Sequence, residues 1–345
     1  MLEHGGALRR AAAHYGRPLA DWLDLSTGIN PQGWPVPPLP AAVWQRLPEE
    51  DDGLEDAARA YYANPNLVAV AGSQVALETL PTLFPRQMIA CLGPLYAEHP
   101  AAWQRAGHRV RQIPAGRLDR ALAALTPLVL LCNPNNPGAQ RFSRQELLAA
   151  AAQLQQRGGS LIVDEAFIDA TPEDSVADLA GSAAAPRLVV LRSLGKFFGL
   201  AGLRAGFLLG APELCESLRH RLSPWHLSHP SRWVATQALR DQAWQAATRE
   251  QLHAASSRLQ QLFDTQALPG FAPARRTPLF VWLAAEKTTN SEQDLAATLA
   301  EHLATHHGIL VRRFPDPAAL RIGLPGDEAG WARLTAALTD FPRQV

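Results

Sequence analysis

The stretch RLVVLRSLGKFFGLAGLRAGFLLG, residues 187–210, decides how the rest of the chain is interpreted. Two apolar runs of strand length bracket a glycine-rich turn that contains Ser193, Lys196 and Arg204. Apolar surroundings make a lysine amine a better nucleophile toward a carbonyl, and a nearby hydroxyl and guanidinium can hold a phosphate. The combination favours a Schiff-base lysine beside a phosphate-bearing aldehyde, pyridoxal phosphate. The alternative is a basic surface loop.

The length and composition of the chain indicate a large domain accompanied by a smaller one. At 345 residues it is long for one compact core, and its 47% hydrophobic content supplies ample core material. Alternating helical and strand patterns predict an α/β fold with a mainly parallel sheet in a large domain at 41–225. Residues 1–40 and 226–345 are expected to form the smaller α/β domain. The formal net charge is zero, so bulk electrostatics favour neither nucleic acid nor a membrane as partner.

The cysteines and the hydrophobic pattern bear on location. Cys91, Cys132 and Cys215 are odd in number and widely spaced, which indicates buried free thiols rather than disulfides or a metal pair. The N-terminus lacks the apolar segment of a signal peptide, and no apolar run approaches the ~20 residues needed to cross a bilayer. We therefore expect a soluble, cytoplasmic protein.

Chemically distinctive residues follow four predicted strands that precede the lysine stretch. They are Gly-Ser-Gln at 72–74, Tyr96, Asn136 and Asp164. The carboxyl ends of strands in an open α/β sheet lie on one side and can surround a single ligand. Each residue also has an ordinary interpretation, such as a common turn at 72–74 or a packing role for Tyr96.

Two carboxylates, Asp164 and Glu165, end the strand pattern at 160–167. A carboxylate after several apolar residues is costly to bury without a cationic or hydrogen-bonding partner. On the structural interpretation, one of the two caps a helix or pairs with an arginine. On the functional interpretation, Asp164 faces a protonated ring nitrogen.

The C-terminal third contains a long helical pattern from about 231 to 262 that allows one break, and a second unusual basic residue, Arg321, inside an apolar strand. His302, His306 and His307 have the spacing of metal ligands near a helix end. No cysteine or carboxylate accompanies them at ligand spacing in the sequence, so we expect a solvated helix end and no metal site.

Taken in order, these motifs resemble those of the fold-type-I pyridoxal-phosphate enzymes, in the branch that contains histidinol-phosphate aminotransferase. The resemblance covers nearly the whole chain. It is specific because five motifs occur in the family's order: GSQ at 72–74, PLY at 94–96, NPNNP at 133–137, VDEAF at 163–167 and SLGKFFGLAGLRAGF at 193–207.

The resemblance implies a role for each of these residues. Lys196 would form the Schiff base and later move protons, Asp164 would pair with the pyridinium nitrogen, and Tyr96 would stack on the ring. Asn136 would bond the ring's 3-oxygen or the substrate carboxylate, and Arg321 matches the family's arginine for that carboxylate. The cofactor phosphate would be held by Ser73, Gln74, Ser193 and Arg204.

Two differences from the usual aminotransferase pattern, together with the N-terminal segments, indicate which group within this family the chain resembles. Phe167 stands where aminotransferases usually carry a tyrosine that bonds the ring's 3-oxygen, and Leu47 stands where many carry a tyrosine that reaches a partner subunit. The segments HGG at 4–6 and DLSTGINP at 24–31 resemble the opening of the threonine-phosphate decarboxylases of cobalamin biosynthesis, and Phe167 also fits that group.

This second resemblance implies a homodimeric lyase that takes a small phosphorylated amino acid. It would decarboxylate O-phospho-L-threonine to (R)-1-amino-2-propanol O-2-phosphate. His4, Gly5, Gly28 and Asn136 would line the substrate. Arg312 and Arg321 would bind its phosphate and carboxylate, in an order left open, with Arg313 as the alternative to Arg312 because strand alternation turns only one of them inward.

Two other functions remain open at this point. The lysine stretch would serve an aminotransferase for histidinol phosphate or a related phosphorylated amine equally well. The two reactions differ in which bond of the substrate is held perpendicular to the cofactor ring, and orienting groups therefore select between them. A third hypothesis is a binding protein without catalysis, against which the intact set of Lys196, Asp164 and Arg204 argues.

Overall fold

The computed structural model describes residues 4–286 and 294–342. The chain forms two compact units, a smaller one of Met1–Gln32 with Arg249–Val345 and a larger one of Gly33–Thr248. The boundaries expected from the sequence, after residues 40 and 225, both fall inside the larger unit. There, the Trp34 N–H donates to the Phe198 carbonyl over 2.8 Å, and Arg232 pairs with Asp52 at 2.6 Å.

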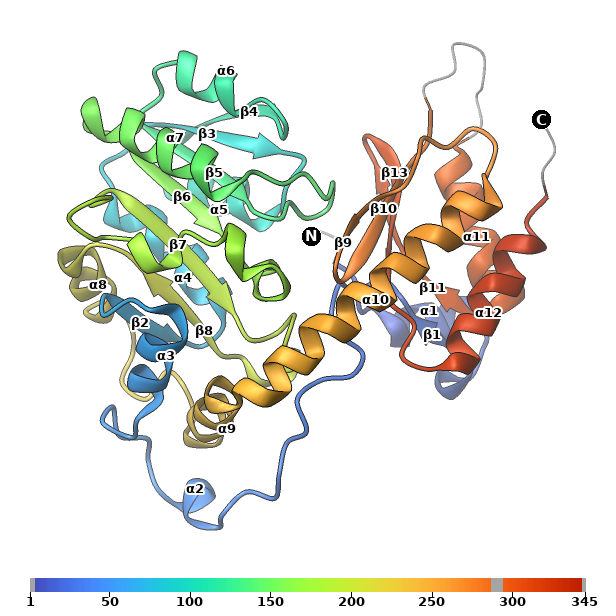
Figure 1. The fold of residues 1–345 in the computed structure, drawn as a ribbon, viewed down its shortest axis with the longest axis horizontal. Helices are drawn as coiled ribbons and strands as arrows, with labels where there is room; N and C mark the ends of the chain where they lie inside the picture. Colours follow the sequence, from blue (N-terminus) through green and yellow to red (C-terminus); the bar gives the residue numbers. More distant parts are fainter. Residues whose placement is uncertain (1–3, 287–293, 343–345) are drawn as a thin grey trace. The chain divides into compact units, whose positions relative to one another are not determined.

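A seven-stranded mixed sheet forms the centre of the larger unit (Figure 1). In spatial order its strands are β2 (Leu67–Val70), β8 (Gly206–Leu209), β7 (Leu188–Ser193), β6 (Ser160–Asp164), β5 (Leu128–Cys132), β3 (Met88–Gly93) and β4 (Arg109–Pro114). Strand β8 is antiparallel to both neighbours, and the remaining pairs are parallel. The mainly parallel α/β fold predicted from the sequence is confirmed.

Helices flank this sheet, as Figure 1 shows. Strands β5, β6 and β7 are buried along their whole length, which is why their sequences are continuous apolar runs rather than alternating ones. A capping box between Ser143 and Glu146 is present at the start of α7. The helices are α2 (Ala42–Gln45), α3 (Leu54–Tyr62), α4 (Ser73–Thr79), α5 (Glu98–Arg105), α6 (Leu118–Ala123), α7 (Arg144–Gln156), α8 (Pro212–Arg219) and α9 (His229–Arg240).

The predicted long helix is broken once, at Asp241, into α9 and α10 (Gln242–Gln266). Short 3-10 segments occur within the larger unit at Leu80–Leu83, Ile168–Ala170, Pro172–Asp174, Ala177–Leu179 and Ala201–Leu203. Among the described residues, no helix is both long enough and apolar enough to span a membrane.

The smaller unit is built on an antiparallel sheet in the order β12 (Arg312–Pro315), β13 (Ala318–Gly323), β10 (Phe280–Ala284) and β9 (Arg275–Thr277). A short parallel pair, β1 (Leu23–Asp24) with β11 (Ile309–Leu310), joins the N-terminal segment to the C-terminal part of the chain. The unit also contains α1 (Leu8–Tyr15), the 3-10 turn Leu19–Asp21, α11 (Leu295–His307) and α12 (Glu328–Thr339).

Candidate active site

Close backbone packing gathers the predicted phosphate-binding residues at the ends of β2, β7 and β8. Ser193 pairs with Gly206 across β7 and β8. A Cβ on Gly206 would lie 2.6 Å from the Ser73 nitrogen, so only glycine permits that approach. The Arg204 guanidinium lies so close to Gly72 that a Cβ there would be 2.5 Å from it. The backbones of Ser73 and Ser193 and the Arg204 guanidinium therefore lie around Gly72 and Gly206, and two serines with an arginine are a donor set that suits a phosphate.

Tyr96 joins this cluster to the next strand end. Its hydroxyl donates to Gln74 Oε1 over 3.2 Å, and its ring centroid lies 6.1 Å from that of His99. Burial, with the carboxylates of Glu98 and Asp164, raises the pKa of Tyr96 to about 12 although Arg204 acts to lower it. The phenol therefore stays protonated near neutral pH.

Asp164 is the last residue of β6, and its buried carboxylate is held from two sides. Oδ2 lies 2.7 Å from His99 Nε2, and Oδ1 accepts the Ala166 N–H over 3.0 Å. Because an ionised carboxylate only accepts hydrogen bonds, His99 Nε2 carries the hydrogen. Sequence reasoning missed His99. The available signal was its position three residues after Tyr96, which places both on one face of a helical turn.

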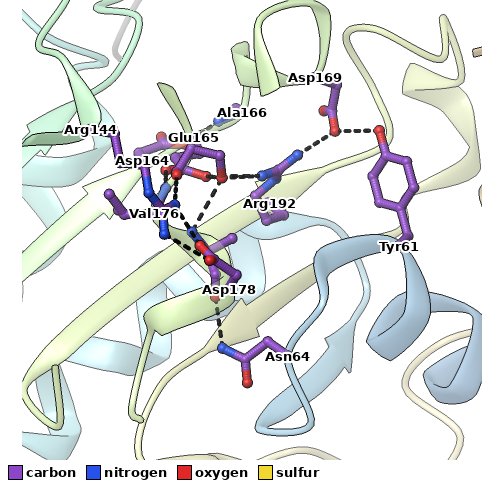
Figure 2. A network of polar contacts seen from close by, with 12 residues as sticks. Tyr61, Asn64, Arg144, Asp164, Glu165, Ala166, Asp169, Val176, Asp178 and Arg192 are labelled. Carbon is purple, nitrogen blue, oxygen red and sulfur yellow. Dashed lines mark hydrogen bonds and ion pairs between the residues drawn. The ribbon is translucent and has the colours of Figure 1, made fainter. Parts of the chain in front are cut away.

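Glu165, rather than Asp164, is the carboxylate that pairs with an arginine, which the sequence alone left open. Its Oε2 is 2.9 Å from Arg192 Nη1, and Arg192 also pairs with Asp169, to which the Tyr61 hydroxyl donates over 2.9 Å (Figure 2). Burial acts to lower the pKa of Arg192, but Asp169 and Glu165 more than offset it, so the pKa is raised. This buried ion-pair network occupies Glu165, whereas Asp164 has a histidine partner.

Lys196 lies on the turn that follows β7, and its Nζ is 5.4 Å from the centroid of the Phe167 ring. Asn136 lies on the loop after β5, and the backbones of Asn136 and Tyr96 both contact the Cys132 thiol. The eight predicted site residues of the larger unit lie at or just after the ends of β2, β3, β5, β6 and β7 or, for Arg204, just before β8; they are Ser73, Gln74, Tyr96, Asn136, Asp164, Ser193, Lys196 and Arg204.

In the smaller unit, Arg321 is buried against the segment 24–31. Its Nη2 donates to the Ser26 carbonyl over 2.6 Å, and a Cβ on Gly5 would lie 2.3 Å from that same oxygen. The Ser26 hydroxyl in turn donates to Asp24 over 2.6 Å and accepts the Gly6 N–H. Gly28 is buried within this segment, and His4, which precedes Gly5 in the chain, is exposed. Gly5 and Arg321 are therefore neighbours around Ser26.

The register of β12 and β13 distinguishes Arg312 from Arg313. Arg312 is directly opposite Arg321, so the two side chains leave the same face of the sheet. Arg313 is opposite Leu320 on the other face, where its Nε is 3.9 Å from Asp294. Burial, then the Arg312 charge, lowers the pKa of Arg321 to about 10, and it remains cationic at neutral pH. Two like charges side by side are unfavourable unless an anion offsets them.

Two groups among the described residues have side chains spaced closely enough to hold a metal ion. The first is His99, Cys132 and Asp164, where a hydrogen bond already joins histidine to carboxylate and burial raises the pKa of the thiol, which disfavours the thiolate a metal needs. The second is His302, His307 and Asp340, in which His307 Nε2 lies 3.2 Å from the carboxylate. The absence of a bound metal stays a prediction.

The donor set of the larger unit fits a pyridine aldehyde phosphate. It offers an amine beside an apolar ring, a buried carboxylate for a ring nitrogen, an aromatic face, and hydroxyl and guanidinium donors for a phosphate. This fit rests on side chains that come from six separate segments of the chain.

The chain belongs to the aminotransferase class I and II family, which matches residues 21–340. A threonine-phosphate decarboxylase from Pseudomonas aeruginosa is 49% identical over 341 residues, covering 99% of this chain and 98% of the relative. Another from Sinorhizobium sp is 38% identical, covering 98% and 97%. The crystal structure of histidinol-phosphate aminotransferase from Sinorhizobium meliloti with pyridoxal-5'-phosphate has a TM-score of 0.81 at 21% identity, covering 98% and 95%. The family predicted from the five motifs is confirmed.

Proposed function

We propose that this chain is a pyridoxal-phosphate-dependent decarboxylase of O-phospho-L-threonine. The reaction releases CO2 and leaves (R)-1-amino-2-propanol O-2-phosphate. The observation that carries the proposal is the side-by-side pair of Arg312 and Arg321, because it suits a substrate with both a carboxylate and a phosphate. The two relatives named threonine-phosphate decarboxylase, similar over nearly their whole length, support the same reaction.

Residues of the larger unit hold the cofactor, which when bound supplies an electron-accepting ring. Lys196 would be its covalent attachment point and would move protons. Asp164 would pair with the ring nitrogen, and His99 donates a hydrogen bond to that carboxylate. Tyr96 would stack on the ring, and Asn136 would bond its 3-oxygen or the substrate carboxylate. Ser73, Gln74, Ser193 and Arg204 hold the cofactor phosphate.

Residues of the smaller unit orient the substrate. Arg321 and Arg312 bind the carboxylate and phosphate, and the segment with His4, Gly5 and Gly28 lines the site. The Ser26 carbonyl fixes one arm of the Arg321 guanidinium, which limits its movement and so favours one orientation of the bound anion. Groups that bind the carboxylate and phosphate orient the substrate, and orientation selects the bond that breaks.

Phe167 supports the same choice. Where a tyrosine would donate to a ring oxygen, this chain places an apolar ring near the Lys196 ammonium. Such a ring offers a cation–π contact but no hydrogen bond. The electronic tuning that aminotransferases obtain from the tyrosine is therefore absent from this position.

The proposal includes a homodimer in the cytoplasm that serves cobalamin biosynthesis. Trp44 and Leu47 are 68% and 60% exposed, and His229 contacts the backbone of Arg46 between them. Large apolar side chains exposed together are typical of an interface. Three buried free cysteines are compatible with a reducing compartment. Light scattering of the purified protein tests the dimer, and a monomeric mass would contradict it.

The reaction is tested with O-phospho-L-threonine labelled in its carboxyl carbon. Labelled CO2 from the wild type, lost in Lys196→Ala, is the expected result. Arg321→Ala should raise KM and lower kcat together, because a misoriented carboxylate spoils the reacting geometry. Absence of CO2 together with 2-oxoglutarate-dependent turnover of histidinol phosphate would show an aminotransferase instead.

A further inference from the structure

The turn that carries Lys196 packs against an aromatic residue of α10. Phe197 and Phe198, which directly follow the lysine, are completely buried. The indole of Trp244 stacks on the Phe198 ring at a centroid distance of 5.6 Å and an interplanar angle of 18°, and it meets Phe197 edge-on at 5.5 Å. The two residues after the lysine are thus packed against the first turns of α10.

A second contact reaches the same turn from the start of the larger unit. The Trp34 N–H donates to the Phe198 carbonyl over 2.8 Å. Gly33 approaches so closely that a Cβ on it would lie 3.0 Å from that carbonyl oxygen and 3.1 Å from the Gly199 Cα. The backbone at 33–34 therefore fixes the far side of the lysine turn.

Asp241 ties these two contacts together. Its Oδ2 accepts the indole N–H of Trp34 over 3.0 Å, and its Oδ1 accepts the backbone N–H of Trp244 over 3.0 Å. The carboxylate thus caps α10 and anchors Trp34 at once. Trp34 is 7% exposed, which protects this hydrogen bond from water.

Trp34, Asp241 and Trp244 lie close in sequence to the two places where the chain connects the units. The chain passes between the two units twice, at Gln32–Gly33 and at Thr248–Arg249. Trp34 lies just after the first crossing, and Asp241 and Trp244 lie shortly before the second. Both connections to the smaller unit are therefore fastened to the two residues that follow Lys196.

We propose that Asp241, acting through Trp34 and Trp244, is a positioning residue for Lys196. It fixes the lysine turn to both chain connections, so a displacement of either connection is transmitted to the lysine amine. The inference rests on the proposed function in one respect, that Lys196 is the reactive amine. It requires no particular substrate.

The experiment measures Lys196 directly in cofactor-free protein. The chain has two lysines, Lys196 and Lys287, so reductive methylation of each can be followed by peptide mass spectrometry. The rate is recorded against pH, and the rate at which added pyridoxal phosphate reacts is followed by absorbance. Asp241→Asn keeps a helix cap but cannot accept from Trp34 with its amide nitrogen, and Trp34→Phe removes the same bond from the other side.

The control is Trp22→Phe. Trp22 is 8% exposed and also uses its indole N–H, donating to the Arg17 carbonyl over 3.4 Å in the smaller unit. We expect Asp241→Asn and Trp34→Phe each to change the Lys196 methylation rate by about threefold or more, as a pKa change of ~0.5 unit would. The double variant should add little, because both changes remove one bond. Lys287 in every variant, and Lys196 in Trp22→Phe, should keep wild-type rates.

A purely structural role for Asp241 and Trp34 would give a different result. If Asp241→Asn and Trp34→Phe lower the unfolding temperature but leave Lys196 methylation and its reaction with pyridoxal phosphate within twofold of wild type, these residues only stabilise the fold. Circular dichroism identifies a variant that fails to fold, in which case the other variant decides. Neither readout involves O-phospho-L-threonine, so failure of the decarboxylase assay leaves this test intact.

Discussion

Replacing His99 by phenylalanine tests how the buried carboxylate of the site is maintained. The change keeps a flat ring of similar size in a position that is 1% exposed, and it removes the 2.7 Å hydrogen bond to Asp164 Oδ2. The carboxylate then keeps the Ala166 N–H as a backbone donor. A hydrogen bond to a charged group contributes about 1.5–3 kcal/mol. If that free energy supports the charge that holds the cofactor, pyridoxal phosphate should bind about 10–150-fold more weakly.

The assay is quenching of tryptophan fluorescence as pyridoxal phosphate is added to cofactor-free protein. His108→Phe is the matched control, since His108 is buried and hydrogen-bonded, with Nε2 2.9 Å from the Pro81 carbonyl. It should lower the unfolding temperature without weakening cofactor binding. His99→Gln, which keeps an N–H donor, should restore part of the affinity. Wild-type affinity in His99→Phe would refute the reasoning and leave His99 a packing residue.

Three further outcomes follow from the contacts described above. Arg312→Gln should raise KM for O-phospho-L-threonine at least tenfold, whereas Arg313→Gln, on the opposite face of the sheet, should leave KM within twofold of wild type. Equal effects of the two changes would contradict the inference that Arg312 is the arginine that binds the substrate. Arg192→Met should lower the free energy of unfolding in urea by about 3–5 kcal/mol, because it leaves two carboxylates buried without their cation. The control Arg117→Met, which removes an ion pair at the surface, should leave the urea midpoint unchanged. Burial raises the pKa of Glu165 above its usual 4.5. The protonated carboxyl therefore favours the folded state below pH 4.5, and this stabilisation is lost as pH rises through the folded-state pKa. Glu165→Gln should flatten the plot of urea midpoint against pH, and an unaltered slope would exclude Glu165 as the source of the pH dependence.

Much of the larger unit could be predicted from its sequence because its signals are local. Continuous apolar runs mark strands buried on both faces, as in β5 (Leu128–Cys132). The capping box at Ser143 is encoded within four residues. The ends of these strands could be located, and parallel strands place such ends on the same edge, so eight candidate site residues could be expected to lie together.

The partners of the two carboxylates could not be predicted, because they are distant in sequence. Asp164 is the last residue of β6 and Glu165 directly follows it, and strand alternation alone does not say which of the two meets a cation. Glu165 meets Arg192, 27 residues away, and Asp164 meets His99, 65 residues away. Only the packing of α5 and β7 against β6 determines those pairs.

The arginines of the smaller unit show the same limit. Alternation places Arg312 and Arg313 on opposite faces of a strand, so both remained candidates. The register of β12 against β13 places Arg312 beside Arg321, and a register is a property of two segments together. The contacts of Trp34 and of α9 within the larger unit are also long-range, so local patterns do not fix the extents of the two units.

The central claim is tested most directly by the products formed from O-phospho-L-threonine in deuterated water, identified by mass spectrometry. The expected product is an aminopropanol phosphate that has lost its carboxyl group, retains its nitrogen and carries one solvent deuteron on the carbon that lost CO2. Its formation should need no 2-oxoglutarate. A phosphorylated keto acid that retains the carboxyl group, with the nitrogen transferred to 2-oxoglutarate, would contradict the account and make the chain an aminotransferase.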